Sequence, residues 1–500
     1  MITISCKETT YTYNIYHIVR AFYPDEEIEQ RLDAEQEPLV RAERRENTDS
    51  DAGSRDWIRF EITEADAERA EAGETGTETS ETVSSGIDVQ RRKRTVTKLA
   101  YQFLSAQSGR QLAWGMLTGV RPTKLAMRTI EQGKSEAETA AFLQKEYGVS
   151  EKKAVLAVDI AKREKQLLSS LDEKDGFSLY VGIPFCPSIC AYCSFSSSPV
   201  DVWKDRVDAY LDALCREISA IGEITAASGK RLNTVYIGGG TPTTLEPDQL
   251  ERLLSWIDRI FPEDDLLEYT VEAGRPDSIT RQKLEVLRRH PVTRISVNPQ
   301  TMQQKTLDAV GRRHTVQDVK EAFHMARELG FDNINMDLIA GLPGEGAAQM
   351  QDTLRQIEEL APDSLTVHSL AIKRAARMGQ EKKSSQSAEI ARMIEDSEKA
   401  AARMGMKPYY LYRQKNIAGN FENVGYAKVD KAGIYNILIM EEKQTIYAAG
   451  AGASTKIVLP EKVRLKNGKE TNLIRIENVK NIEEYIRRID EMIENKREQI

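Results

Sequence analysis

The sequence has few of the features that mark secreted, membrane-bound or disulfide-stabilised proteins. It contains five cysteines and five histidines in 500 residues, and its first residues lack the apolar core of a signal peptide. No segment approaches the roughly 18 uninterrupted apolar residues of a membrane helix. The sequence therefore predicts a cytoplasmic protein with reduced thiols and no membrane span, in which a disulfide framework is disfavoured.

An excess of positive charge is also lacking. The chain has 70 Lys and Arg against 78 Asp and Glu, a net charge of −8, which argues against a general nucleic-acid binder. Five hundred residues are too many for one compact core, so we expect several domains. We divide the chain into a small α+β module (1–95), a helical linker region (96–172), a central region (173–404) and a C-terminal region (405–500).

Three of the five cysteines lie close together, in the spacing Cys186-x3-Cys190-x2-Cys193. A structural zinc site would need a fourth Cys or His nearby. The next cysteine, Cys215, lies in a helical pattern, and the nearest downstream histidine is His290. A [4Fe–4S] cluster held by three thiolates keeps one iron without a protein ligand. A zinc knuckle and a chance spacing are the alternatives.

The central region alternates strand-like and amphipathic helical segments. Such βα units form a parallel sheet with right-handed crossovers, which makes this an α/β protein. The helical segments include Trp203–Ile221, Gln249–Ile260 and Val316–Leu329. The predicted strands are Ser178–Ile183, Thr234–Gly238, Leu267–Glu272, Thr293–Val297, Asn333–Ile339 and Ser364–Leu370.

Glycines and polar residues follow these strands one after another. A glycine run lets the backbone approach a ligand closely, although alone it is usually just a turn. Each polar residue singly is more often a salt bridge or a cap, but several at consecutive strand ends would face the same mouth. The residues are Gly239, Gly240 and Thr241 after the second strand, Glu272 at the third, Gln300 and Arg312 after the fourth, and Asp337 in the fifth.

The cysteine loop, with Tyr192 just before its last cysteine, resembles the cluster loop of radical S-adenosylmethionine (SAM) enzymes. The resemblance implies a [4Fe–4S] cluster on Cys186, Cys190 and Cys193, with SAM on the open iron. It also implies that backbone groups of the glycine run receive the amino group of SAM. The implied fold is a partial (β/α)6 barrel with an N-terminal α+β and helical extension and a C-terminal α+β cap, and the chemistry lies at the C-terminal ends of the strands.

Residues from about 178 to 370 resemble one branch of these enzymes, the oxygen-independent coproporphyrinogen III dehydrogenases, also called oxidases. The closest likeness is to the paralogue of Gram-positive anaerobes, which has a long N-terminal extension. The intervals from Gln300 to Arg312 and Asp337 match the SAM contacts of that family. Tyr180 matches a contact of the cluster-bound SAM, and Tyr192 matches, with those three residues, a contact of a second SAM.

The resemblance implies the reaction. A 5′-deoxyadenosyl radical takes hydrogen from a propionate of coproporphyrinogen III, and loss of CO2 and one electron leaves a vinyl group. Two such steps use two SAM molecules per turnover and give protoporphyrinogen IX. The partners are then a tetrapyrrole substrate and an electron donor such as flavodoxin or ferredoxin. Candidate cations for the substrate carboxylates are Arg275, Arg313, Lys373 and Arg374.

Two positions depart from the best-understood dehydrogenases. Phe195 stands where they have a further cysteine, and Gly182 stands where they have a histidine. A related branch with phenylalanine at the first position contains haem chaperones. The alternative functions are therefore a haem-binding protein with a retained cluster, or a radical SAM enzyme that acts on another tetrapyrrole.

The flanking regions give simpler patterns. At the N-terminal side we expect a strand at Ile2–Ser5, a helix at Tyr13–Tyr23, a strand at 57–62 and a solvated turn at Arg91–Arg94. Residues 95–171 are helical in pattern, with an interhelical turn at 114–124. The C-terminal region has strand-like runs at Gly433–Met440 and Thr445–Ala448 and one charged helix at Glu483–Lys496.

Overall fold

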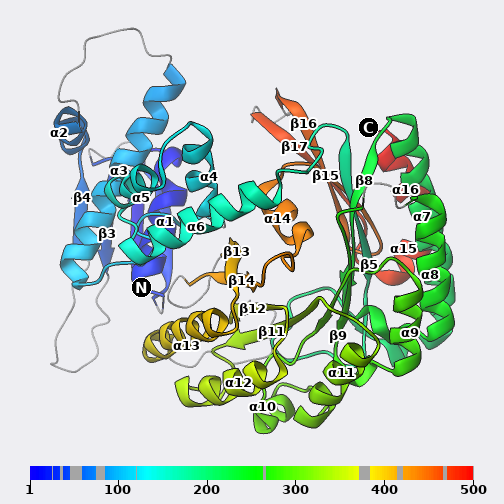
Figure 1. Ribbon diagram of the computed structural model, residues 1–500. Coiled ribbons are helices and arrows are strands. Elements are labelled where there is room, and N and C mark those ends of the chain that lie inside the picture. The colour runs from blue at the N-terminus through cyan, green and yellow to red at the C-terminus, as the bar shows by residue number, and fades with distance from the viewer. Residues whose placement is uncertain are drawn as a thin grey trace. The chain divides into compact units, whose positions relative to one another are not determined.

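The computed structural model of the chain divides into two compact units (Figure 1). The first holds residues 1–161, 380–388 and 413–422, and the second holds residues 162–379, 389–412 and 423–500. The structure describes residues 1–24, 26–33, 38–44, 59–74, 85–119, 121–262, 266–370, 383–413, 421–464 and 470–498. Within these ranges no helix combines the length and hydropathy that a membrane span requires.

The first unit contains a four-stranded sheet in the order β2-β1-β3-β4. Strand β1 pairs parallel with β2 and antiparallel with β3, and β3 pairs antiparallel with β4. The strands are β1 (Ile2–Cys6), β2 (Ile28–Leu32), β3 (Val40–Arg44) and β4 (Arg59–Ile62). The helices are α1 (Thr9–Phe22), α2 (Glu64–Glu74), α3 (Ser85–Ser108), α4 (Thr123–Glu131), α5 (Glu136–Tyr147) and α6 (Glu151–Leu167), the last of which continues into the second unit.

The sequence predicts most of this unit. The expected first strand and first helix are confirmed, and so is the part of the third expected element that the structure describes, β4. The expected turn at Arg91–Arg94 is wrong, because these residues lie inside α3. The four side chains are partly buried: Arg91 donates to the Glu71 carbonyl, and Arg92 pairs with Glu64 and Glu71 of α2. The later residues Val96, Ala100 and Leu104 are buried in the core of the unit.

The second unit is built on an eleven-stranded sheet in the order β13-β14-β12-β11-β10-β9-β8-β5-β15-β16-β17. Six neighbouring strands, from β5 to β12, are parallel and follow one another in sequence order. They are β5 (Gly176–Ile183), β8 (Arg231–Gly239), β9 (Glu268–Gly274), β10 (Arg294–Val297), β11 (Ile334–Ala340) and β12 (Ser364–Ser369). All six predicted strands are confirmed.

Helices connect these strands and lie along the outside of the sheet (Figure 1). Each parallel strand is followed by at least one helix, so the predicted six βα units of a partial barrel are confirmed. The helices are α7 (Val207–Ala227), α8 (Pro247–Ile260), α9 (Arg281–Arg289), α10 (Gln304–Ala309), α11 (Val316–Glu328), α12 (Ala347–Leu360) and α13 (Lys383–Arg403).

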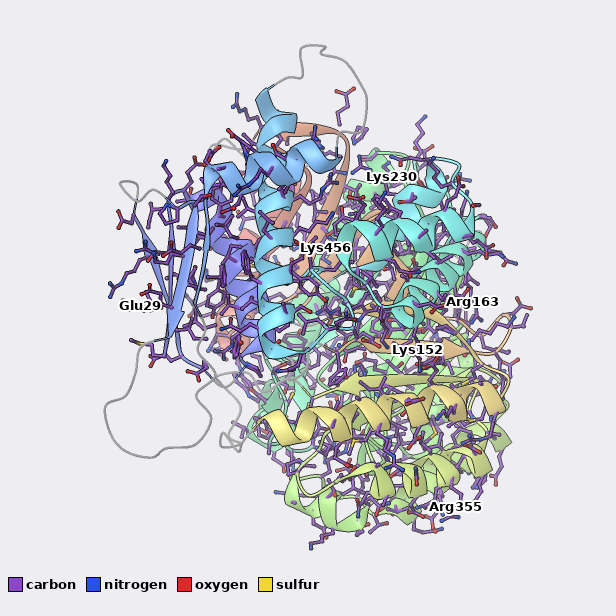
Figure 2. All side chains as sticks on the ribbon, turned by 90° about the vertical axis from the view of Figure 1, so that its left-hand side faces the viewer. Glu29, Lys152, Arg163, Lys230, Arg355 and Lys456 are labelled. Atoms are coloured by element: carbon purple, nitrogen blue, oxygen red, sulfur yellow. The ribbon has the colours of Figure 1, made fainter. Side chains whose placement is uncertain are left out.

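C-terminal strands extend both edges of the parallel sheet. On one side β14 pairs antiparallel with β12 and β13 with β14; on the other, β15 pairs parallel with β5 and is followed by the antiparallel β16 and β17. Arg163 of α6, labelled in Figure 2, donates hydrogen bonds to the carbonyls of Ala427 (3.0 Å) and Lys428 (3.2 Å). The added strands are β13 (Lys407–Tyr412), β14 (Asn423–Ala427), β15 (Thr445–Ala449), β16 (Ser454–Arg464) and β17 (Glu470–Glu477).

Two C-terminal expectations need correction. The expected strand at Gly433–Met440 is a helix, α14 (Ile434–Glu441), because the buried carboxylate of Glu268 accepts the backbone N–H groups at its start. The expected single terminal helix is two, α15 (Ile482–Arg487) and α16 (Ile489–Arg497). The four-part division of the chain stays a prediction.

Candidate functional site

The three closely spaced cysteines lie in the loop that follows β5. The loop begins with a two-residue strand, β6 (Phe185–Cys186), which pairs with β7 (Ser198–Pro199) and so closes its base. All five cysteines of the chain are free thiols, and the Cys186 side chain is buried while Cys190 and Cys193 are partly exposed. Burial raises the pKa of the Cys186 thiol, and the neighbouring Cys193 and Cys190 act in the same direction.

The glycine run after β8 packs directly against this loop. The backbone N–H of Gly240 donates to the carbonyl of Ile183 (2.7 Å), and that of Thr241 donates to Phe185 (2.7 Å). The Thr241 hydroxyl lies 3.6 Å from the Cys186 sulfur. A side-chain Cβ at Gly240 would lie 2.5 Å from the Phe185 carbonyl oxygen and 3.0 Å from that sulfur, so only glycine fits.

Glu272, at the end of β9, faces a stack of tyrosines. Its carboxylate accepts a hydrogen bond from the hydroxyl of Tyr236, whose ring stacks on Tyr435 with centroids 4.4 Å apart. The ring of Tyr180 stacks on both, at 6.3 Å from each. Burial raises the pKa of Glu272 to about 7, and the nearby Asp337 adds to the rise.

Gln300 and Asp337 lie side by side on neighbouring chain segments. Gln300 has a left-handed backbone (φ 67°), its N–H donates to the Asp337 carbonyl (2.9 Å), and its carbonyl accepts from Ile339 (2.9 Å). Asp337 accepts a hydrogen bond from Asn335 (2.7 Å) and faces His368, 3.8 Å away. Burial alone would raise the pKa of Asp337, but His368 and the Asn335 amide outweigh it and lower that pKa.

Tyr192 and Arg312 form the link between the cysteine loop and the fourth βα unit. Arg312 donates to the Tyr192 hydroxyl (3.0 Å) and to the Asn298 carbonyl (2.6 Å), and it is 4% exposed. Burial raises the pKa of Tyr192 above its ordinary value, although Arg312 acts against this. The structure thus brings the three cysteines and the nine other predicted residues to the C-terminal ends of β5, β8, β9, β10 and β11.

The chemistry of these residues fits a [4Fe–4S] cluster with SAM. Within the described ranges no three Cys, His, Asp or Glu side chains gather closely enough to hold one metal ion, but each thiolate of a four-iron cluster binds a different iron. Three residues that follow β10 have a buried polar atom without a partner among the described residues: Gln300 Oε1, Arg312 Nε and Asn298 Oδ1. Such atoms are costly unless a ligand pairs them, and SAM offers hydroxyl, amino and carboxylate groups.

The residues expected to hold substrate carboxylates have different positions. Arg275 is 4% exposed and turned into the protein, where it binds Asp277, so its predicted role as a substrate cation is not supported. Arg313 is exposed and lines a groove of about 680 Å³ beside the loop, together with Pro187, Ile189 and Asp201. Lys373 and Arg374 lie outside the described residues.

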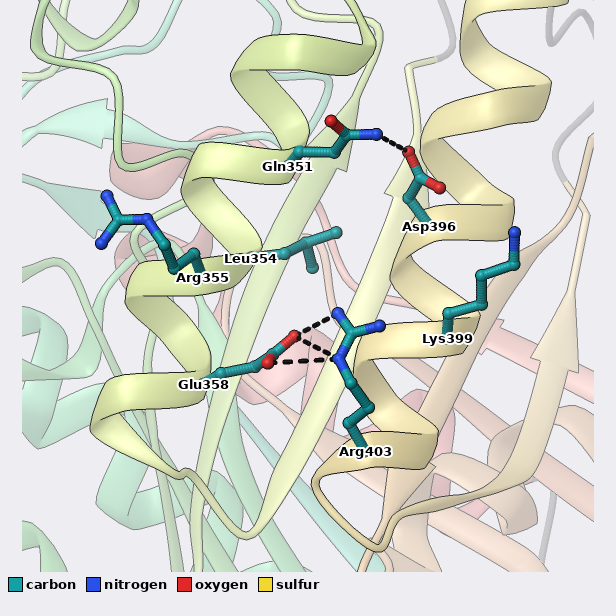
Figure 3. Close-up of a pocket in the computed structure, with 7 residues that line it drawn as sticks. All are labelled: Gln351, Leu354, Arg355, Glu358, Asp396, Lys399 and Arg403. Atoms are coloured by element: carbon teal, nitrogen blue, oxygen red, sulfur yellow. Dashed lines mark hydrogen bonds and ion pairs between the residues drawn. The ribbon is translucent and has the colours of Figure 1, made fainter.

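A second groove lies between α12 and α13 and shares no lining residue with this site (Figure 3). Its polar side chains bind one another: Gln351 donates to Asp396 (2.8 Å), and Arg403 contacts Glu358. These are ordinary interhelical contacts on a surface, so the groove is not a candidate site.

Sequence reasoning missed three residues of the site. Tyr236 and His368 lie on β8 and β12, and Tyr435 lies in the first turn of α14, a segment expected to be a strand. His368 had a signal, because it sits near the C-terminal end of the sixth predicted strand, where the other site residues end their strands. No sequence signal indicates Tyr435, since its neighbours in the tyrosine stack are about 200 residues or more away in sequence.

Comparison with known proteins identifies the same region. Residues 180–357 match the family described as the Radical SAM superfamily. The chain is 43% identical over 371 residues to the oxygen-independent coproporphyrinogen-III oxidase-like protein HemZ of Bacillus subtilis (strain 168), which covers 73% of this chain and 74% of the relative. It is also 39% identical over 196 residues to the heme chaperone HemW of the same organism, covering 39% of this chain and 50% of the chaperone.

Among solved structures, the chain is similar to the coproporphyrinogen III oxidase HemN of Escherichia coli, described as a radical SAM enzyme. The TM-score is 0.50 at 22% sequence identity, and the match covers 66% of this chain and 72% of that one. At this identity the similarity shows the fold, which is the partial barrel with its mouth at the strand ends described above.

Proposed function

We propose, since this chain belongs to the oxygen-independent coproporphyrinogen-III oxidase-like proteins of the radical SAM superfamily, that it decarboxylates coproporphyrinogen III. Two propionates become vinyl groups and the product is protoporphyrinogen IX. For each propionate a hydrogen atom, CO2 and one electron leave. The observation that carries the proposal is the similarity to a coproporphyrinogen-III oxidase-like relative over 73% of this chain.

Proteins of this superfamily use a [4Fe–4S] cluster and SAM, which together supply a radical able to take hydrogen from carbon. In this chain we assign the cluster ligands to Cys186, Cys190 and Cys193, whose loop closes on itself through β6 and β7. The reducing electron is to come from a small carrier such as flavodoxin or ferredoxin.

The surrounding residues suit the binding of SAM. Gly239 and Gly240 present backbone groups beside the loop, and Thr241 holds Cys186 in place by its hydroxyl. Gln300 and Asp337 offer acceptors for hydroxyl or amino groups. With a pKa of about 7, Glu272 either accepts or donates a hydrogen bond near neutral pH.

The remaining site residues orient these groups and exclude water. The stacked rings of Tyr180, Tyr236 and Tyr435, of which Tyr435 is buried and the other two are partly exposed, line the site beside Glu272. Arg312 suits a carboxylate, because its Nε has no partner among the described residues while its other nitrogens fix it to Tyr192 and Asn298. A radical reaction requires such shielding, since water and side reactions would otherwise quench it.

The test is an anaerobic assay. The cluster is reconstituted, SAM, a reductant and coproporphyrinogen III are added, and 5′-deoxyadenosine and porphyrin products are separated by chromatography. We expect protoporphyrinogen IX with two deoxyadenosines per molecule, and no deoxyadenosine from Cys190→Ala. Deoxyadenosine that forms without decarboxylation would contradict the proposed substrate.

A second candidate function is haem binding by a protein that retains the cluster. Two observations favour it: the similarity to a heme chaperone, and the Phe195 side chain, which is 75% exposed just after the third cysteine of the loop. An exposed aromatic ring at this position suits a flat tetrapyrrole. Titration with haem, followed by absorbance, tests this: tight binding weakened in Phe195→Ala, with little turnover of coproporphyrinogen III, would select this function.

A further inference from the structure

Arg275 occupies a position that the substrate-binding expectation does not explain. It follows β9 in Glu-Ala-Gly-Arg-Pro-Asp277, where the left-handed Gly274 (φ 62°) turns the chain back toward the cysteine loop. Its guanidinium binds Asp277 with two nitrogens, Nε to Oδ1 at 2.9 Å and Nη2 to Oδ2 at 2.6 Å. This bidentate geometry fixes the plane of the guanidinium.

The third nitrogen of Arg275 reaches the cysteine loop. Nη1 donates to the carbonyl of Ser188 (2.9 Å) and lies 2.8 Å from its hydroxyl, between the first two cysteines. The same nitrogen lies 3.8 Å from the sulfur of Cys190. All three nitrogens of the guanidinium are therefore engaged, which explains why Arg275 is 4% exposed and directed away from solvent.

A second set of contacts holds the same loop segment. The Ser188 hydroxyl donates to the carbonyl of Gly311 (3.0 Å), and the N–H of Ala191 donates to the carbonyl of Val310 (3.0 Å). The segment from Ser188 to Ala191 is thus held both by Arg275 and by the turn before Arg312.

We infer that Arg275 is a positioning residue for the iron-binding loop and places a fixed positive charge beside the Cys190 thiolate. The inference rests on the proposed function, in which Cys186, Cys190 and Cys193 are the cluster ligands. A donor and a positive charge next to a cluster sulfur stabilise the reduced, more negative state, and so raise the reduction potential. Asp277 acts through Arg275, because it holds the guanidinium in this orientation.

The first measurement uses the full chain without iron, so it does not depend on activity. Hydrogen exchange of the backbone amides of residues 188–193 is compared in wild type, Arg275→Met and Asp277→Asn. We expect roughly tenfold faster exchange in both variants, the factor that corresponds to the net contribution of about one hydrogen bond. Arg281→Met, which removes an exposed pair with Glu328, is the matched control and should leave the loop unchanged.

The second measurement separates charge from geometry after reconstitution. Arg275→Lys keeps the positive charge but loses the bidentate contact, so it should loosen the loop. Arg275→Met should shift the midpoint potential of the cluster to a more negative value. The potential of Arg275→Lys should stay nearer to that of the wild type. Ser188→Ala removes only a hydroxyl, is the mildest variant for folding, and should loosen the loop by a smaller factor.

The outcomes distinguish this inference from the proposed function. Wild-type exchange in Arg275→Met and Asp277→Asn, together with a wild-type potential in Arg275→Met, would overturn the inference, whatever the substrate is. A loosened loop in both variants, with a more negative potential in Arg275→Met, would support it even if coproporphyrinogen III were not decarboxylated, because neither readout uses a tetrapyrrole.

Discussion

The buried pair of Lys496 and Glu217 allows a sharp test of how the C-terminal helices are held. Lys496 of α16 is 1% exposed and lies 2.6 Å from the carboxylate of Glu217, on α7, which is fully buried. Glu217 also accepts hydrogen bonds from Asn478 (2.8 Å), the Tyr485 hydroxyl (2.5 Å) and the Gly450 N–H (2.9 Å). This network joins the C-terminal segments to α7.

The perturbation is Lys496→Met, which leaves the Glu217 carboxylate buried without its cation. Loss of one partner of such a pair costs about 3 to 5 kcal/mol. Hydrogen exchange of the α7 amides should then be faster by roughly a hundredfold or more, since each 1.36 kcal/mol is a factor of ten. Glu217→Gln in the same chain should recover part of the loss, because it removes the buried charge.

Arg497→Met is the matched control. It removes the neighbouring ion pair with Glu223, whose side chains are 48% and 67% exposed, and exposed pairs contribute about 0 to 1 kcal/mol. If Lys496→Met and Arg497→Met have equal effects on α7, the buried carboxylate does not depend on Lys496 and the reasoning fails.

Three further predictions concern single residues, Glu272 and Gly240 in the second unit and Trp114 in the first. Burial raises the pKa of Glu272 from 4.5 to about 7, so ionisation of this carboxyl lowers the free energy of unfolding by up to about 3 kcal/mol. This cost is absent below pH 4.5 and complete above pH 7. Glu272→Gln should flatten the loss of stability between these pH values, as measured by denaturant unfolding at several pH values. Gly240→Ala should lower the iron bound per chain after reconstitution, whereas Gly119→Ala, with open space around it, should not. Trp114→Phe removes a 2.7 Å hydrogen bond to buried Glu422 and should destabilise the first unit by about 1 to 3 kcal/mol in thermal unfolding, with no effect if the bond is absent.

The sequence predicts the sheet because its signals are local. The parallel strands are short apolar runs buried on both faces, so composition alone marks them, and their order follows from the alternation with helices. The polar site residues could be found for the same reason: Glu272 and Asp337 interrupt or end apolar strands, where a carboxylate needs an explanation.

The missed features depend on contacts between distant segments. The apolar run of α14 looks like a strand, and only the carboxylate of Glu268, 166 residues away, makes its start helical. The contacts of Arg275 with Ser188 and Cys190 could not be predicted, because these partners are more than 80 residues away in the sequence. No periodicity or spacing in the sequence indicates contacts between segments so far apart.

The pairing of β15 with β5 also has a consequence for the order in which the site is made. Strand β5 ends directly before the cysteine loop, and one of its two neighbours, β15, begins 262 residues after β5 ends, at Thr445. On the ribosome the cysteines emerge long before that neighbour exists. The Gly182 carbonyl, which accepts from Tyr210, lies at the same junction as Gly450, which binds Glu217. A nascent chain can therefore contain all six βα units while β5 is still an open edge, and the loop gains its full support only after residues 445–496 have been synthesised. We expect iron loaded during synthesis to be held less firmly than iron loaded onto the finished chain.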